Sequence, residues 1–252
     1  MKQMIKHFGF TLAEVLITLG VIGVVAAMTI PALVNSTQDR EIVSRLKKAY
    51  SILSNAYTLA VQNEGGTPEG WGFTGVMDPD KEIMINKLKP YLNVAKDCSV
   101  ANVKGCFKAN ESYYWLNTNY MDILDRGNSL LLADGTSLYA YGVSSPTCVT
   151  SRGNTLPLKN ICGIFEIDVN GFNKPNIIGK DTFWFYLTRY GIIPIGTSAE
   201  SGYPFDSSCV NSSGTLDQGL ACTAWVLYNE NLDYVKCPIT LKNGWSGPTK
   251  CQ

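Results

Sequence analysis

The sequence predicts an α+β protein in which one long N-terminal helix packs, through its second half, on a small antiparallel sheet head with disulfides. Three observations predict this fold class. A nearly uncharged apolar run occupies residues 10–33, and an amphipathic helical pattern continues from it to about residue 64. All eight cysteines and every hairpin signal lie beyond that pattern.

The apolar run from Phe10 to Leu33 predicts a transmembrane helix. It holds one charged residue, Glu14, among about 24 residues, and would be about 36 Å long as a helix, against a bilayer core of about 30 Å. Lys2, Lys6 and His7 precede it and form a positive region that favours the cytoplasm. We therefore expect a single-pass membrane protein whose N-terminus is cytoplasmic and whose head lies outside.

A cleaved secretory signal is the alternative interpretation of the same run. Ala26-Ala27 could mimic a cleavage site of the small-x-small type. However, the run continues through Leu33 without a turn signal, which favours the membrane helix.

Beyond Pro31 the helical pattern becomes amphipathic. We expect Pro31 to kink or locally melt the helix, because proline lacks an N–H and clashes with the preceding turn. Gly65-Gly66, followed by Pro68, predicts the end of the helix. Apolar residues recur at helical spacing and should pack against the head: Ile42, Leu46, Ala49, Tyr50, Leu53, Ala56, Tyr57, Ala60 and Val61.

The cysteines indicate an oxidising compartment. Their even number and their absence from the apolar run predict a disulfide framework formed by Cys98, Cys106, Cys148, Cys162, Cys209, Cys222, Cys237 and Cys251. Zinc is disfavoured because no pair has the C-x2-C spacing. Eight cysteines allow about 105 connectivities. Neighbours stand 8, 14, 13 and 14 residues apart, so pairing between neighbours is one open possibility among these.

The head carries signals for hairpins and short helices. Asp134-Gly135 within residues 129–141 predicts one hairpin, and Asn170-Gly171 between strands at 164–169 and 181–187 predicts a second. Helical patterns cover Asp80–Leu92 and residues 221–235.

Composition excludes several function classes. The chain has 252 residues with 21 basic and 21 acidic side chains, a balance that argues against phosphate neutralisation and so against a nucleic-acid partner. His7 is the single histidine, and neither a nucleophile elbow nor an acid/base pair is evident. We therefore expect no enzymatic activity.

The segment Gly9-Phe10-Thr11-Leu12-Ala13-Glu14-Val15-Leu16-Ile17 resembles the cleavage and methylation motif of type IV pilins and type II secretion pseudopilins. The shared features are a short basic leader, Gly then Phe, a Glu five residues into the run, and a long apolar helix. The resemblance implies cleavage after Gly9 by a prepilin peptidase and N-methylation of Phe10. It divides the chain into a leader (1–9), a filament-core helix (10–34), an amphipathic helix half (35–66) and a globular extracytoplasmic head (67–252).

Glu14 has two interpretations that are mutually compatible. A carboxylate inside a membrane helix costs about 2.5 to 3.5 kcal/mol on insertion scales, so such residues are functional hypotheses by default. The resemblance implies an assembly role, in which Glu14 meets the N-terminal amine of a neighbouring subunit. Alternatively, Thr11 and Glu14 form a capping box, T-x-x-E, at the helix start.

The loop from Asp168 to Asp181 also has two interpretations. Its residues are similar to a D-x-N-G…P-N…G-x-D loop of pseudopilin heads that binds calcium, and Asp168, Asn170 and Asp181 offer the hard oxygen ligands that Ca²⁺ prefers. Alternatively, Asn and Asp form Asx turns that merely join the strands. The turn is the favoured interpretation, and no other cofactor is expected.

The sequence and the resemblance together predict a structural subunit of a type II secretion pseudopilus or type IV pilus-like filament. A minor or tip pilin that acts as an adhesin or in DNA uptake is the alternative. The resemblance implies related pilin subunits, a prepilin peptidase, and an inner-membrane assembly platform with its ATPase motor as partners. It places the protein in the bacterial inner membrane, with the head in the periplasm or in a surface filament.

Overall fold

The computed structural model describes residues 11–99, 105–107, 113–117, 120–121, 128–143, 146–209, 218–237, 239 and 245–251. The chain divides into two units, residues 1–40 and 41–252. Helix α1 (Leu12–Asn63) contributes to both. The predicted boundaries at 34/35 and 66/67 therefore do not coincide with the division, because the helix from Glu41 onward folds with the head.

The part of α1 in the second unit packs one stripe of side chains into the head. The stripe follows the helical period and consists of Val43, Leu46, Ala49, Leu53, Ala56, Tyr57 and Ala60, all buried. The helix is followed by Gly65 and Gly66, both with a φ of +92°. These findings confirm the predicted amphipathic half and its end.

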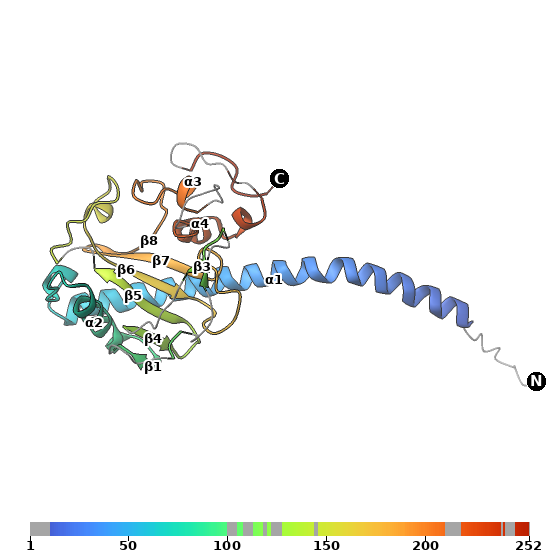
Figure 1. Ribbon diagram of the computed structural model, residues 1–252, viewed down its shortest axis with the longest axis horizontal. Coiled ribbons are helices and arrows are strands. Elements are labelled where there is room, and N and C mark those ends of the chain that lie inside the picture. Colours follow the sequence, from blue (N-terminus) through green and yellow to red (C-terminus); the bar gives the residue numbers. More distant parts are fainter. Residues whose placement is uncertain are drawn as a thin grey trace, which may run out of the picture. The chain divides into compact units, whose positions relative to one another are not determined.

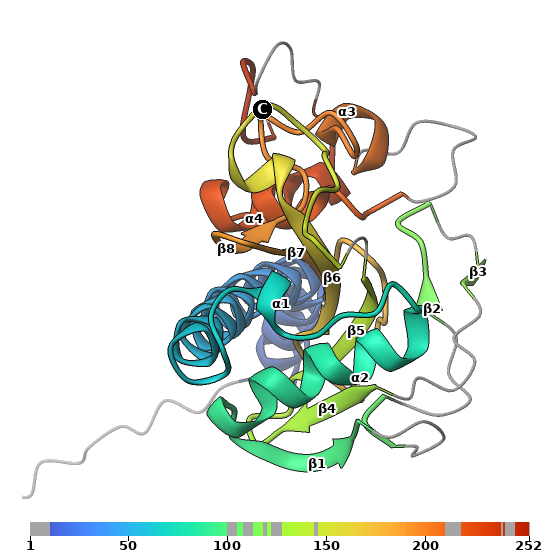
Figure 2. The same ribbon diagram turned by 90° about the vertical axis from the view of Figure 1, so that its left-hand side faces the viewer.

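The head contains a six-stranded sheet in which every pairing is antiparallel (Figure 1). Figure 2 shows the same strands from a second side. The strands of this sheet lie in the order β1-β4-β5-β6-β7-β8. They are β1 (Val94–Cys98), β4 (Ser129–Leu132), β5 (Ser137–Val143), β6 (Ile161–Asp168), β7 (Thr182–Thr188) and β8 (Gly191–Pro194). The pairs β4–β5 and β6–β7 confirm both predicted hairpins. A separate pair joins β2 (Tyr113–Tyr114) and β3 (Tyr120–Met121).

Both faces of the central strands are covered. In β7, Phe183, Phe185 and Leu187 belong to the main core, which also contains the stripe of α1 and the buried apolar residues of α2 (Met77–Leu88). The alternate residues Trp184 and Tyr186 belong to a second cluster. This alternation follows from the two-residue period of a strand, and it explains why β6 and β7 are buried along their whole length.

The last strand of the sheet and the turn that precedes it are linked to α1 by two tyrosines. Tyr50 Oη donates to the carbonyl oxygen of Ile192 at 3.2 Å, and Tyr57 Oη donates to that of Arg189 at 2.7 Å. The Tyr50 ring also stacks on Phe185, with centroids 5.5 Å apart. An edge strand covered by a helix is protected from pairing with another chain.

Two predicted helices have different bounds in the structure. The helix expected at Asp80–Leu92 is α2, which begins at Met77 and ends at Leu88, and Lys89–Tyr91 form the 3-10 turn η2. Pro90 cannot donate the next helical hydrogen bond, which accounts for the change. Asp80 is not the helix start, because α2 begins three residues earlier, at Met77. Its buried carboxylate accepts from the N–H groups of Thr74 and Gly75, both at 2.7 Å.

The pattern at residues 221–235 is likewise split. It forms α4 (Cys222–Asn229) and the 3-10 turn η4 (Asp233–Val235), with Glu230 between them in the left-handed region at a φ of 56°. Further short helices are η1 (Pro68–Gly70), η3 (Pro157–Lys159) and α3 (Phe205–Ser208).

All eight cysteines are paired with their neighbours in the sequence. The four bridges are Cys98–Cys106, Cys148–Cys162, Cys209–Cys222 and Cys237–Cys251. The predicted disulfide framework is thereby confirmed. The sequence left the connectivity open, and the structure pairs each cysteine with its neighbour in the sequence.

Candidate functional site

The first unit presents an apolar helix surface with no cover. Leu12–Ile30 is long and apolar enough to cross a membrane, judged by length and composition, and none of it is buried inside the protein. Leu12 and Met28 are 79% and 75% exposed. An exposed apolar surface of this extent is unfavourable in water, and lipid or other apolar helices are the surroundings that suit it.

Thr11 and Glu14 form the predicted capping box at the start of α1. The N–H of Thr11 donates to Glu14 Oε2 at 2.8 Å, and the N–H of Glu14 donates to Thr11 Oγ1 at 3.2 Å. Thr11 Oγ1 also donates to Glu14 Oε2 at 2.8 Å. The reciprocal bonds satisfy two N–H groups that the helix itself leaves without partners. Gly9 and Phe10, the predicted cleavage and methylation site, lie outside the described residues.

The helix continues through Pro31. Residues on both sides of it are helical, so the expected local melting is wrong. Pro31 has no N–H to donate to the carbonyl of Ala27, so this intrahelical bond cannot form. The kink expected at this residue stays a prediction.

The second candidate site is the loop between β6 and β7, where two buried carboxylates lie close together. Asp168 Oδ1 accepts from the N–H groups of Asn170 and Gly171 at 3.2 and 2.8 Å, and its Oδ2 accepts from Tyr113 Oη at 2.6 Å. Asp181 Oδ1 accepts from the N–H of Ile177 at 2.6 Å. Its Oδ2 accepts from the N–H of Asn176 at 2.8 Å.

Asn170 connects the two carboxylates. Its backbone N–H donates to Asp168, and its Nδ2 donates to Asp181 Oδ2 at 3.1 Å. The structure therefore brings together all three residues predicted from the sequence. Two buried carboxylates at close range disfavour double ionisation. Burial and the charge of Asp181 raise the pKa of Asp168 well above its usual range, and burial raises the pKa of Asp181 to about 6.

The contacts that Asp168 makes in this loop are those of Asx turns, since its Oδ1 accepts from the N–H groups of Asn170 and Gly171. Calcium takes six to eight oxygen ligands that point at the ion. Here each of the four carboxylate oxygens accepts a hydrogen bond from an N–H or O–H group.

Sequence reasoning missed the partners of the buried acids. Tyr113, 55 residues before Asp168 in the chain, supplies the hydroxyl donor and is fully buried. A second buried pair, Tyr186 and Glu200, was also missed. Neither pair has a local signature, because each is made by residues that only the folded chain brings together.

Comparison with protein-family models, with curated proteins and with solved structures finds no match for this chain.

Proposed function

We propose that this chain is a structural subunit of a type II secretion pseudopilus or a type IV pilus-like filament. It is made as a precursor, cleaved after Gly9 and methylated on the new N-terminal Phe10. The observation that carries the proposal is Glu14, a carboxylate near the start of a helix that is apolar and exposed over Leu12–Ile30 and directly follows the Gly9-Phe10 motif.

The energetics of the helix support storage in a membrane followed by assembly. An uncovered apolar helix of this length is stable in lipid or within a bundle of similar helices. Gly20 and Gly23 have no heavy atom within 4 Å of the place where a Cβ would lie, so their surface is open to a neighbouring helix. Small residues at this spacing allow close helix approach.

In this proposal, Glu14 sets the register between neighbouring subunits of the filament. Its carboxylate is not needed for apolar insertion, and an apolar residue would insert more cheaply. The capping box holds the carboxylate at the first turn of α1. There, the terminal amine of the next subunit would be its complementary charge.

The head suits a compartment outside the cytoplasm. Four disulfides form and persist in oxidising surroundings such as the periplasm or the cell surface. The positive leader orients the helix so that the head is translocated.

Three variants separate the capping role of Glu14 from an assembly role. Glu14→Gln keeps a side chain that can close the capping box but removes the charge. Thr11→Ala removes the hydroxyl cap but keeps the charge, and Glu14→Ala removes the charge together with the glutamate half of the capping box. We expect all three to insert, and only Thr11→Ala to enter filaments at near wild-type amounts. The measurement is the amount of subunit in sheared or cross-linked filaments against the amount in the membrane fraction, in cells that carry the assembly machinery.

Normal filament incorporation of Glu14→Gln would contradict the assembly role. Cleavage is tested separately by N-terminal sequencing and mass spectrometry of the wild-type chain beside Gly9→Leu. A mature chain that begins at methylated Phe10 is expected for the wild type only. An uncleaved wild-type chain in the presence of prepilin peptidase would overturn the proposal as a whole.

A further inference from the structure

The four disulfides differ sharply in their access to solvent. Six of the eight cysteines are buried, with exposed fractions of 0 or 1%. Cys237 and Cys251 are the exception, since both are partly exposed. They form one bridge with each other, so the solvent-exposed cysteine surface of the head is concentrated in Cys237–Cys251.

Access decides which bridge can react. Thiol–disulfide exchange requires a thiolate to reach one sulfur of the bridge, and burial prevents this approach. We infer that Cys237–Cys251 is the thiol–disulfide exchange site of this chain, and that a dithiol reductant opens it reversibly and frees the segment 245–251. This inference is independent of the filament proposal.

The exchange balances without any further reactant. The reductant's thiolate attacks one sulfur, forms a mixed disulfide, and expels the other cysteine as a thiolate that takes up a proton. The second thiol of the reductant then attacks the mixed disulfide. Cys237 and Cys251 leave as two thiols, having gained two electrons, and the reductant leaves as a disulfide.

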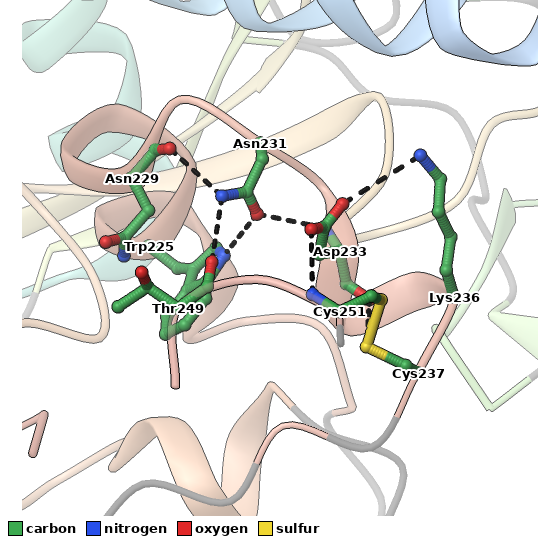
Figure 3. A network of polar contacts seen from close by, with 8 residues as sticks. All are labelled: Trp225, Asn229, Asn231, Asp233, Lys236, Cys237, Thr249 and Cys251. Carbon is green, nitrogen blue, oxygen red and sulfur yellow. Dashed lines mark hydrogen bonds and ion pairs between the residues drawn. A yellow bond between two sulfur atoms is a disulfide. The ribbon is translucent and has the colours of Figure 1, made fainter. Parts of the chain in front are cut away.

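Side chains of the turn that follows α4 keep the two cysteines together, as Figure 3 shows. Asn231 Nδ2 donates to the carbonyl of Thr249 at 3.0 Å, and the N–H of Cys251 donates to Asp233 Oδ2 at 3.0 Å. These two bonds do not depend on the bridge. When the freed segment docks again, they place Cys251 near Cys237, which favours renewed oxidation.

Asn231 is itself held by two donors. Its Oδ1 accepts from Trp225 Nε1 at 3.1 Å and from the N–H of Asp233 at 3.0 Å. The clasp, meaning Asn231 and Asp233 with their bonds to Thr249 and Cys251, is thus anchored on α4. On one side of the bridge, the carbonyl oxygen of Asp233 contacts both sulfur atoms, at 3.6 and 3.5 Å, so attack must come from another side.

The segment also carries an optical reporter. The Trp245 ring lies 5.8 Å from Trp225 and 5.5 Å from Tyr228, measured between centroids. Release of the segment would separate these rings and change the tryptophan emission.

The test is a stepwise reduction of the full chain in detergent. Dithiothreitol is added in increasing amounts, free thiols are blocked with iodoacetamide, and the remaining cysteines are reduced fully and labelled with a heavier reagent for mass spectrometry. We expect Cys237 and Cys251 to be labelled together and at least tenfold faster than the other six. Equal or faster labelling of any other pair would overturn the inference.

Two variants and one control variant complete the test. Cys237→Ser/Cys251→Ser should show no emission change at dithiothreitol levels that open the wild-type bridge, and the same change in this variant would contradict release of the segment. After removal of dithiothreitol, the reduced chain is reoxidised with oxidised glutathione, which takes up the two electrons. Asn231→Ala should slow this step several-fold because it loosens the clasp, whereas Asn173→Ala, an exposed control outside the clasp, should not. Equal reoxidation rates in the wild type, Asn231→Ala and Asn173→Ala would exclude a role for the clasp. If Asn231→Ala does not fold, the wild-type labelling order still decides the inference.

Discussion

Glu200 is a buried carboxyl whose partners come from separate parts of the head. Tyr186 Oη donates to Oε1, and the N–H of Gly196 donates to Oε2 at 3.0 Å. Burial raises the pKa of Glu200 to about 7, although these hydrogen bonds favour its charged form. The folded head therefore holds a proton on Glu200 over a range of pH in which the unfolded chain has lost it.

The stability of the folded head should fall as the pH rises, because the folded state keeps the proton on Glu200 to a higher pH than the unfolded chain does. Since the pKa in the folded state lies above the ordinary value of 4.5, the contribution of Glu200 is fully present below about pH 4.5 and is lost as the pH rises through about 7. The loss is on the order of 3 kcal/mol. Denaturant unfolding of the wild type and Glu200→Gln at pH 5 and 8 checks this, and we expect a smaller pH dependence in the variant. An equal dependence in both proteins would refute the assignment.

Calcium should have no effect on stability. The carboxylate oxygens of Asp168 and Asp181 accept hydrogen bonds from the protein, so an ion would have to displace these donors. We expect the thermal midpoint to be the same with a chelator, with excess calcium and with excess magnesium. A rise with calcium alone would restore the calcium interpretation.

At the scale of the element, the second half of α1 is held by packing rather than by intrinsic helix propensity. Leu46 is fully buried in the main core, whereas Leu59, on the same helix, is 42% exposed. A leucine-to-alanine change at each removes the same atoms from two different surroundings.

We expect Leu46→Ala to lower the free energy of unfolding by about 3 kcal/mol and Leu59→Ala by less than about 1 kcal/mol. The first change leaves a cavity in the core, and the second does not. Denaturant unfolding followed by circular dichroism measures both, and similar losses would show that the stripe of α1 is not part of the core.

The turn after β8 depends on a glycine. Gly196 has a φ of +91°, and a Cβ there would lie 1.9 Å from the carbonyl oxygen of Ala221. Gly142 in β5 has no heavy atom within 4 Å of the corresponding place. We expect Gly196→Ala to cost about 2 to 4 kcal/mol and Gly142→Ala less than about 0.5 kcal/mol. Thermal unfolding compares the two, and a neutral Gly196→Ala would contradict the close approach.

For the whole molecule, the disulfides close loops that the head would otherwise have to order by packing alone. Cys148–Cys162 and Cys237–Cys251 both join residues 14 apart, so loop entropy gives each about 3 kcal/mol. They differ in burial, since only the first pair lies inside the core.

Replacing both cysteines by serine should therefore cost more at the buried bridge. We expect Cys148→Ser/Cys162→Ser to lose about 1 to 3 kcal/mol more than Cys237→Ser/Cys251→Ser, because its hydroxyls are buried. The difference in denaturant midpoint measures this, and the reverse order would contradict the burial of the first bridge.

Local patterns in the sequence determined much of this protein. The apolar run, the amphipathic half of α1, the capping box of Thr11 and Glu14, and both hairpins are set by residues within a few positions of each other. Short-range hydrogen bonds and periodicity suffice to predict them. The sequence also brought out Asp168, Asn170 and Asp181 as neighbours in one loop.

Only the tertiary structure decided the rest. It ended α4 at Asn229, buried Asp168 under Tyr113, paired Glu200 with Tyr186, and left one bridge of four accessible. Burial and hydrogen-bond partners depend on segments that are distant in the chain and meet only after folding. For this reason the pKa of an acid and the access to a disulfide are properties of the folded head, whereas a helix and its cap can be predicted from neighbouring residues.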